Sequence, residues 1–309
     1  MFKKLCLTVI AFLFTISLSA REPETPYIIV LGTAQDGGYP HLGCEKECCR
    51  LAWSNPELKR FVVALALVDP GSGSWYLFEA TPDMSEQIHY FRELTNARYK
   101  YLPDAIFVSH AHIGHYTGLM ELGREAMNSA GVPVYALPGM SNFLRNNGPW
   151  DQLVKLQNID IIDLSPGSVI ALADNISVQA FEVPHRDEYS ETAGYRIAAG
   201  TKKYLFIPDI NKWKVWTGDI ISVVRSVDYA FIDGTFYSEN ELAGRSMEEI
   251  PHPFITETIH LFGDESDETK RKINFIHLNH SNPALYDQKI IKKINESGFG
   301  LAEQGRKYW

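Results

Sequence analysis

The sequence has no excess of basic residues, with 29 Lys and Arg against 38 Asp and Glu and a formal net charge of −9 over 309 residues. Nucleic acids and anionic membrane surfaces are bound through basic patches, so this balance argues against both as partners. A small anionic substrate held by a metal ion remains compatible with an acidic protein. We therefore expect a small-molecule substrate, anionic or neutral, and no nucleic-acid partner.

A bilayer-spanning apolar run is also absent. The apolar stretch from Leu5 to Leu18 is about 14 residues long, short of the ~20 residues that span a bilayer. It follows two lysines and precedes a polar segment, which is the layout of a secretory signal peptide. We expect residues 1–20 to be a signal peptide cleaved near Ala20, and the mature protein to be exported, periplasmic or extracellular, without stable membrane association. A single membrane anchor is the alternative.

Cysteine is scarce, and three of the four cysteines lie in one short segment, "GCEKECCR". Cys44, Cys48 and Cys49 form an odd set, so at most one disulfide can close within it. Low-complexity segments and clear linkers are missing too. Residues 21–309 are therefore expected to form a single domain.

Ten apolar runs rich in β-branched and aromatic residues predict buried strands. They cover residues 27–32, 61–68, 75–80, 105–110, 132–137, 176–183, 194–199, 204–209, 229–234 and 273–278. Helical patterns fall at residues 83–94, 116–130 and 284–296. Two series of strands mixed with helices predict an α/β protein with sheets inside and helices outside.

Polar residues that can bind metals stand at the ends of five of these runs: His110, His185, Asp209, Asp233 and His277. A single histidine at a strand end is usually a hydrogen-bonded loop residue. Five such residues together favour a site built on a rigid sheet, which holds ligands in the geometry that metal chemistry requires. For Asp233 we expect a structural role.

The segment "SHAHIGHYTGL" places His110, His112 and His115 within six positions of a chain that has ten histidines. In an extended segment, His110 and His112 point to the same side. Neutral imidazole is the commonest protein ligand for zinc and also suits iron and manganese. A catalytic ion with an open coordination position lowers the pKa of bound water from about 15.7 to about 7.

This segment resembles the His-x-His-x-Asp-His signature of the metallo-β-lactamase fold superfamily, and His185, Asp209 and His277 follow in the order of that superfamily's later ligands. The segments "VLGTAQDGGYPHLGCEKECCR", "HLNHSNPAL" and "GFGLAEQG" are similar to the coenzyme PQQ synthesis protein B family and to phosphoribosyl cyclic phosphodiesterases. The resemblance implies a four-layer αββα sandwich with the site at the edge where its two sheets meet.

The resemblance also implies the ligands of the catalytic ions. One ion would be held by His110, His112 and His185, and a second by His115 and His277, with Asp209 bridging the two. Gly114 stands where the superfamily has its aspartate, so a weaker second site and a one-metal enzyme are both open. Gly114 is equally compatible with a tight turn. Zinc is expected, and manganese or iron remains open.

Related families hold a structural zinc ion with Cys-x-Cys-x-x-Cys and a late histidine. The resemblance implies such a site here at Cys44, Cys48, Cys49 and His280, although the spacing is altered. A disulfide from Cys44 to Cys48 or Cys49 is the alternative. The roles of His277 and His280 could also be exchanged.

His252 in "EIPHPF" matches a histidine of the related families and is our candidate for substrate binding or proton donation, with Asp209 as the other catalytic residue. The turn at Gly37-Gly38, beside Asp36, is a weak candidate for lining the site.

The resemblance favours an exported metal-dependent hydrolase in which a metal-bound hydroxide attacks a phosphodiester or related ester. Two alternatives remain. One is metal-dependent oxidation of a cofactor precursor, as in the PQQ synthesis protein B family, which has Gln at the position of His112 and keeps the aspartate that Gly114 replaces. The other is a non-enzymatic metabolite-binding protein of the same fold.

Overall fold

The computed structural model describes residues 24–239, 241 and 250–309. The predicted signal peptide, residues 1–20, lies outside the described residues. Within the ranges given, no helix has the length and apolar character that a membrane crossing requires.

The first of two sheets follows the strand order β14-β1-β2-β3-β4-β5-β6. Neighbouring strands are antiparallel from β14 to β3 and parallel from β3 to β6. The strands are β1 (Tyr27–Gly32), β2 (Ala64–Asp69), β3 (Ser74–Phe78), β4 (Ala105–Phe107), β5 (Val132–Ala136), β6 (Ile159–Asp163) and β14 (Lys307–Tyr308).

The second sheet follows the order β13-β12-β11-β10-β9-β8-β7. Its strands are parallel from β10 to β13 and antiparallel from β7 to β10. They are β7 (Val169–Ala173), β8 (Ile176–Val183), β9 (Thr192–Ala199), β10 (Lys202–Ile207), β11 (Tyr229–Asp233), β12 (Ile273–Ile276) and β13 (Gly300–Leu301).

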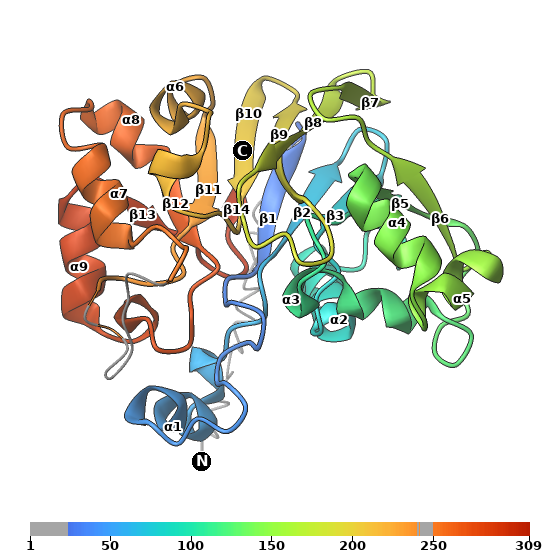
Figure 1. Cartoon of the computed structure of the whole chain (residues 1–309), viewed down its shortest axis with the longest axis horizontal. Coiled ribbons are helices and arrows are strands. Elements are labelled where there is room, and N and C mark those ends of the chain that lie inside the picture. Colours follow the sequence, from blue (N-terminus) through green and yellow to red (C-terminus); the bar gives the residue numbers. More distant parts are fainter. Residues whose placement is uncertain (1–23, 240, 242–249) are drawn as a thin grey trace, which may run out of the picture.

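Helices form two outer groups around the strands, with α2, α4 and α5 on one side and α6 to α9 on the other (Figure 1). The α-helices are α1 (Glu47–Ser54), α2 (Met84–Leu94), α3 (Ile113–Tyr116), α4 (Pro138–Asn146), α5 (Trp150–Lys155), α6 (Ile220–Arg225), α7 (Ile255–Leu261), α8 (Asp267–Arg271) and α9 (Gln288–Glu296).

Three apolar cores separate these layers. In β1, Ile29 packs in a core shared with α2 and α4, whereas Ile28 and Val30 pack in a core shared with the second sheet. A third core joins the second sheet to α6, α7 and α9. Since both faces of the inner strands are buried, these strands are continuously apolar, as in "YIIVLG". The order helix, sheet, sheet, helix confirms the predicted αββα sandwich.

One predicted helix, residues 116–130, is wrong. The chain forms only the short α3 and a 3₁₀ helix, Thr117–Leu122. The amide of Gly118 donates to the carbonyl of Ala80, and a Cβ at Gly118 would lie 2.1 Å from the oxygen of Thr81. This direct packing against the loop after β3 replaces the helical hydrogen bond that a longer helix would need.

Candidate metal centre

The ends of strands from both sheets meet at one site. His110 follows β4 of the first sheet, while His185, Asp209 and His277 follow β8, β10 and β12 of the second. All four side chains are buried. The strand ends predicted from the sequence are therefore brought together at the junction of the two sheets.

A first cluster consists of His110, His112, His185 and Asp209, whose ligand atoms all lie within 4.8 Å of one another. The Nδ1 atom of His112 lies 2.8 Å from Nε2 of His110 and 3.2 Å from Nε2 of His185. Nε2 of His185 is 3.2 Å from Oδ2 of Asp209. Ligand atoms around a tetrahedral zinc ion, each about 2.1 Å from it, are about 3.4 Å apart, so these spacings fit one ion.

A second cluster consists of Asp36, His115 and His277. Nε2 of His115 is 3.4 Å from Oδ1 of Asp36. Oδ2 of Asp209 lies 3.9 Å from Nε2 of His115 and 3.8 Å from Nε2 of His277. Asp209 therefore stands between the two clusters, and Asp36 joins a group that the sequence indicated only weakly.

The residues of the second cluster fit a bound cation. Oδ1 of Asp36 and the Nε2 atoms of His115 and His277 are buried, and none of them has a hydrogen-bond partner among the described residues. Buried polar atoms without partners are costly, so such a group needs a shared partner. A divalent ion satisfies a carboxylate oxygen and two imidazole nitrogens at once.

Several histidines of the two clusters contact another side chain through the ring nitrogen that faces away from the centre. Nδ1 of His115 lies 3.4 Å from Oε1 of Glu79, and Nδ1 of His277 lies 2.8 Å from Oγ1 of Thr235. Nε2 of His112 lies 2.9 Å from Oε2 of Glu188. Such contacts fix the ring orientation and the nitrogen that faces an ion. The sequence offered no periodic signal for Glu79 or Thr235.

Asp209 is a carboxylate at neutral pH. Burial alone would raise its pKa, but the charges of His185, His252 and His277 hold the pKa well below its ordinary value. Burial likewise opposes ionisation of Asp36, but the interaction with His115, whose Nε2 lies 3.4 Å from Oδ1, lowers the pKa of Asp36 to about 2. Both clusters thus contain a negative charge that attracts a cation.

His252 is buried beside the same centre. Its Nδ1 atom lies 2.9 Å from Oδ2 of Asp233 and 3.1 Å from Oδ1 of Asp209. Burial disfavours the charged imidazole, yet these two carboxylates outweigh it and raise the pKa of His252 to about 10. Asp233 also accepts hydrogen bonds from the backbone and hydroxyl of Thr235, so it supports the residues around His277 and His252.

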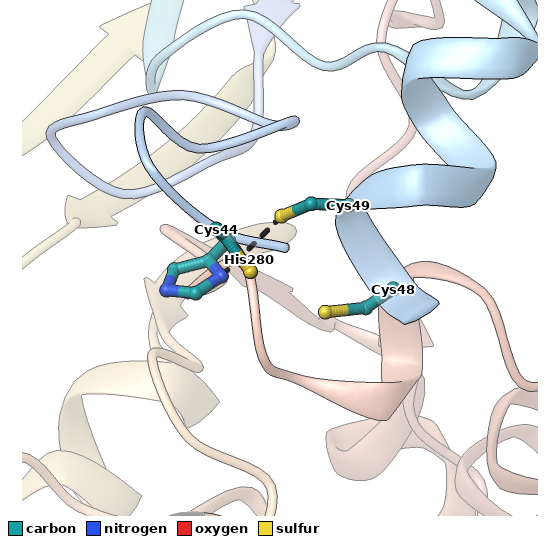
Figure 2. Close-up of side chains that lie close together, drawn as sticks. All are labelled: Cys44, Cys48, Cys49 and His280. Atoms are coloured by element: carbon teal, nitrogen blue, oxygen red, sulfur yellow. Dashed lines mark hydrogen bonds between the residues drawn. The ribbon is translucent and has the colours of Figure 1, made fainter. Parts of the chain in front are cut away.

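The three cysteines gather with His280 at a separate place, and their four ligand atoms lie within 4.8 Å of one another. Cys48 and Cys49 lie in α1, and Cys44 precedes it; the three sulfur atoms and the His280 ring converge (Figure 2). The thiols are free, so the structure contains no disulfide among them. Sγ of Cys49 lies 3.5 Å from Nδ1 of His280. His280 and His277 therefore belong to different clusters.

Comparisons with known proteins identify the family of the chain. A family model described as a beta-lactamase superfamily domain matches residues 74–277. Coenzyme PQQ synthesis protein B of Methylorubrum populi is 27% identical over 311 residues, covering 90% of this chain and 98% of that protein.

Two solved structures share the fold. The crystal structure of Zn²⁺-bound PqqB from Methylobacterium extorquens has a TM-score of 0.76 and 22% identity, covering 92% of this chain and 99% of that one. A diphosphatase from the PhnP family has a TM-score of 0.63 and 21% identity, covering 92% of this chain and 96% of that one. The chain belongs to the beta-lactamase superfamily, and its sandwich is the metallo-β-lactamase fold.

Proposed function

We propose that this chain is a metal-dependent hydrolase that cleaves a phosphodiester or related ester of a small molecule. The observation that carries the proposal is the pair of histidine clusters on either side of Asp209, whose Oδ2 lies within 3.9 Å of four imidazole nitrogens. Similarity to a PhnP-family diphosphatase supports phosphorus-centred chemistry. The N-terminal pattern supports export, which would place the enzyme in the periplasm or outside the cell.

In this proposal, His110, His112, His185 and Asp209 hold one ion. His115 and His277 contribute to a second position beside the same aspartate. Nitrogen and carboxylate ligands suit zinc best and also accept manganese or iron. A divalent ion bound there acts as a Lewis acid and lowers the pKa of water to about 7.

The chain's own residues decide how a substrate meets this centre. The side chain of His112 is 13% exposed, whereas those of His110, His115, His185 and His277 are at most 1% exposed. Among the histidines of the centre, His112 is therefore the one nearest to solvent, and Glu188 contacts its ring. His252, held by Asp209 and Asp233 beside this centre, is our candidate for binding an anionic substrate or for donating a proton to a leaving oxygen.

The proposal predicts that His110→Ala and His112→Ala each lose bound metal and hydrolytic activity. Removing one imidazole leaves the first cluster with three ligand residues instead of four. We expect hydrolysis of bis-p-nitrophenyl phosphate to fall at least about 10³-fold, the upper range for loss of one electrostatic stabiliser. Metal content by plasma mass spectrometry should fall in parallel.

His89→Ala is the matched control, because His89 is an exposed histidine on α2 whose Nε2 lies 3.4 Å from Glu93 of the same helix. It should keep both metal and activity. Ligand binding without turnover, unchanged by His110→Ala, would instead indicate a non-enzymatic binding protein.

His252→Gln should lower kcat by about 10²- to 10⁴-fold with a smaller change in KM, if His252 donates a proton in the reaction. Glutamine keeps a hydrogen-bond donor near Asp233 but cannot carry the charge. Steady-state kinetics and metal analysis on the same preparation test this. A loss of metal that accounts for the whole loss of activity would assign His252 a supporting role instead.

A second candidate is oxidation of a cofactor precursor, favoured by the similarity to coenzyme PQQ synthesis protein B across 98% of that protein. It predicts iron in the purified protein and oxygen-dependent turnover. His112 argues for hydrolysis, because its Nδ1 atom lies 2.8 Å from His110 and completes a histidine-rich set that suits zinc.

A further inference from the structure

The histidine segment has glycine between its second and third histidines, and the structure shows what lies in the space beside it. A Cβ atom at Gly114 would be 2.3 Å from Oδ1 of Asp36 and 2.6 Å from its Cα. These separations are too short for any side chain, so only glycine at position 114 permits this approach of Asp36.

The backbone holds Asp36 in this place. The preceding residues, Ala34 and Gln35, pair with Leu278: Ala34 forms a bridge with it, and the amide of Gln35 donates to its carbonyl at 2.9 Å. Ala34 also forms a bridge with Val62 on its other side. Since Leu278 directly follows His277, these contacts fix Asp36 beside His277.

The three orphaned atoms of this cluster point to one position. Glu79 contacts Nδ1 of His115, and Thr235 contacts Nδ1 of His277, so both rings present Nε2 to the centre. Oδ1 of Asp36 is 3.4 Å from Nε2 of His115. Oδ1 is buried, although the Asp36 side chain as a whole is 24% exposed. A carboxylate that served only solubility would turn both oxygens to water.

We propose that Asp36 is a carboxylate ligand of the second metal ion, together with His115, His277 and Asp209, and that Gly114 provides the space for it. The proposal rests on the metal centre of the proposed function and extends it. The second site is then a complete set of two imidazoles and two carboxylates. The carboxylate comes from the loop after β1 rather than from the histidine segment itself.

Equilibrium dialysis of the full chain against graded Zn²⁺ buffers, followed by plasma mass spectrometry, tests this without measuring activity. Loss of an outer contact to a metal ligand costs about 10- to 100-fold in affinity, so loss of the ligand should cost at least about 100-fold. We expect Asp36→Asn to weaken one binding step by that factor while leaving the other steps unchanged. Identical binding curves for Asp36→Asn and the parent protein would overturn the proposal.

Gly114→Ala tests the same site independently, because the added methyl group would displace Asp36 without removing its charge. It should weaken the same binding step. If Gly114→Ala melts at a much lower temperature than the parent, its metal binding is uninformative, and the binding curve of Asp36→Asn decides whether Asp36 is a ligand. Asp174→Asn is the matched control: it makes the same chemical change at an exposed turn between β7 and β8 and should bind as the parent does.

The outcome separates this inference from the proposed function. His110→Ala should remove a different binding step, that of the first cluster. If Asp36→Asn changes nothing while His110→Ala loses an ion and activity, the hydrolase stands and Asp36 is not a ligand. If His110→Ala changes nothing while Asp36→Asn loses an ion, the second site stands and the catalytic proposal fails.

Discussion

Asp209→Asn should abolish hydrolysis and release the ions of both histidine clusters. Oδ2 of Asp209 lies 3.2 Å from Nε2 of His185 in the first cluster and 3.8 Å from Nε2 of His277 in the second. A neutral amide oxygen supplies the same shape without the charge that two cations share. We expect kcat/KM to fall more than about 10³-fold, beyond the cost of losing a single electrostatic contact.

The measurement combines turnover with metal content on the same sample. The cysteine cluster lies apart from Asp209, so any metal bound there should remain. Asp174→Asn again serves as the control for an Asp-to-Asn change. Retention of all bound ions by Asp209→Asn, with its circular dichroism spectrum unchanged, would show that Asp209 does not bridge the clusters.

Replacing Cys48 and Cys49 together by serine should remove one ion and strongly destabilise the protein. Burial raises the pKa of the Cys49 thiol to about 12, so a nearby cation is needed to keep a thiolate there at neutral pH. Such a cation would tie α1 to the loop after β12, which carries His280. A structural zinc ion contributes several kcal/mol, and each kcal/mol shifts the Tm of a domain this size by about 2–4 °C. We therefore expect Tm to fall by roughly 10 °C or more.

A pair of histidine variants controls for packing effects in this prediction. The ring of His41 stacks on that of His280 with centroids 4.4 Å apart, but the His41 side chain is outside the ligand group. His280→Asn should lose the ion and lower Tm, while His41→Asn should keep the ion. Equal metal content in the double cysteine variant and the parent would contradict a metal site at this cluster.

The hydrophobic pattern predicted the ten inner strands and missed the four edge strands, β6, β7, β13 and β14. Inner strands are covered on both faces and are therefore continuously apolar. Edge strands are either two residues long, as β13 and β14 are, or half-exposed, as in "IDIID" of β6. Their pairing comes from the backbone of the neighbouring strand, which leaves little signal in the sequence.

The residues of the candidate site also fall into two groups: those that the sequence could reveal and those that it could not. Histidines and aspartates at the ends of inner strands could be recognised because a polar residue interrupts an apolar run. Asp36 lacks that signal, since its relation to His115 exists only after distant segments pack together. Glu79 interrupts the apolar run of β3 in the same way, but its contact with His115 also forms only when the chain has folded. The cue for Asp36 was indirect: a glycine at position 114 in a segment otherwise rich in ligands, and an aspartate in the glycine-containing loop after the first strand.

The metal centre can be tested most directly by a crystal structure of the protein grown with Zn²⁺, with anomalous difference maps measured at the zinc absorption edge. We expect one peak among His110, His112, His185 and Asp209, and a second among Asp36, His115, His277 and Asp209. A third peak should lie at the cysteine cluster. Zinc bound only at the cysteine cluster or at surface sites, with no peak beside Asp209, would contradict the proposed metal-dependent hydrolase.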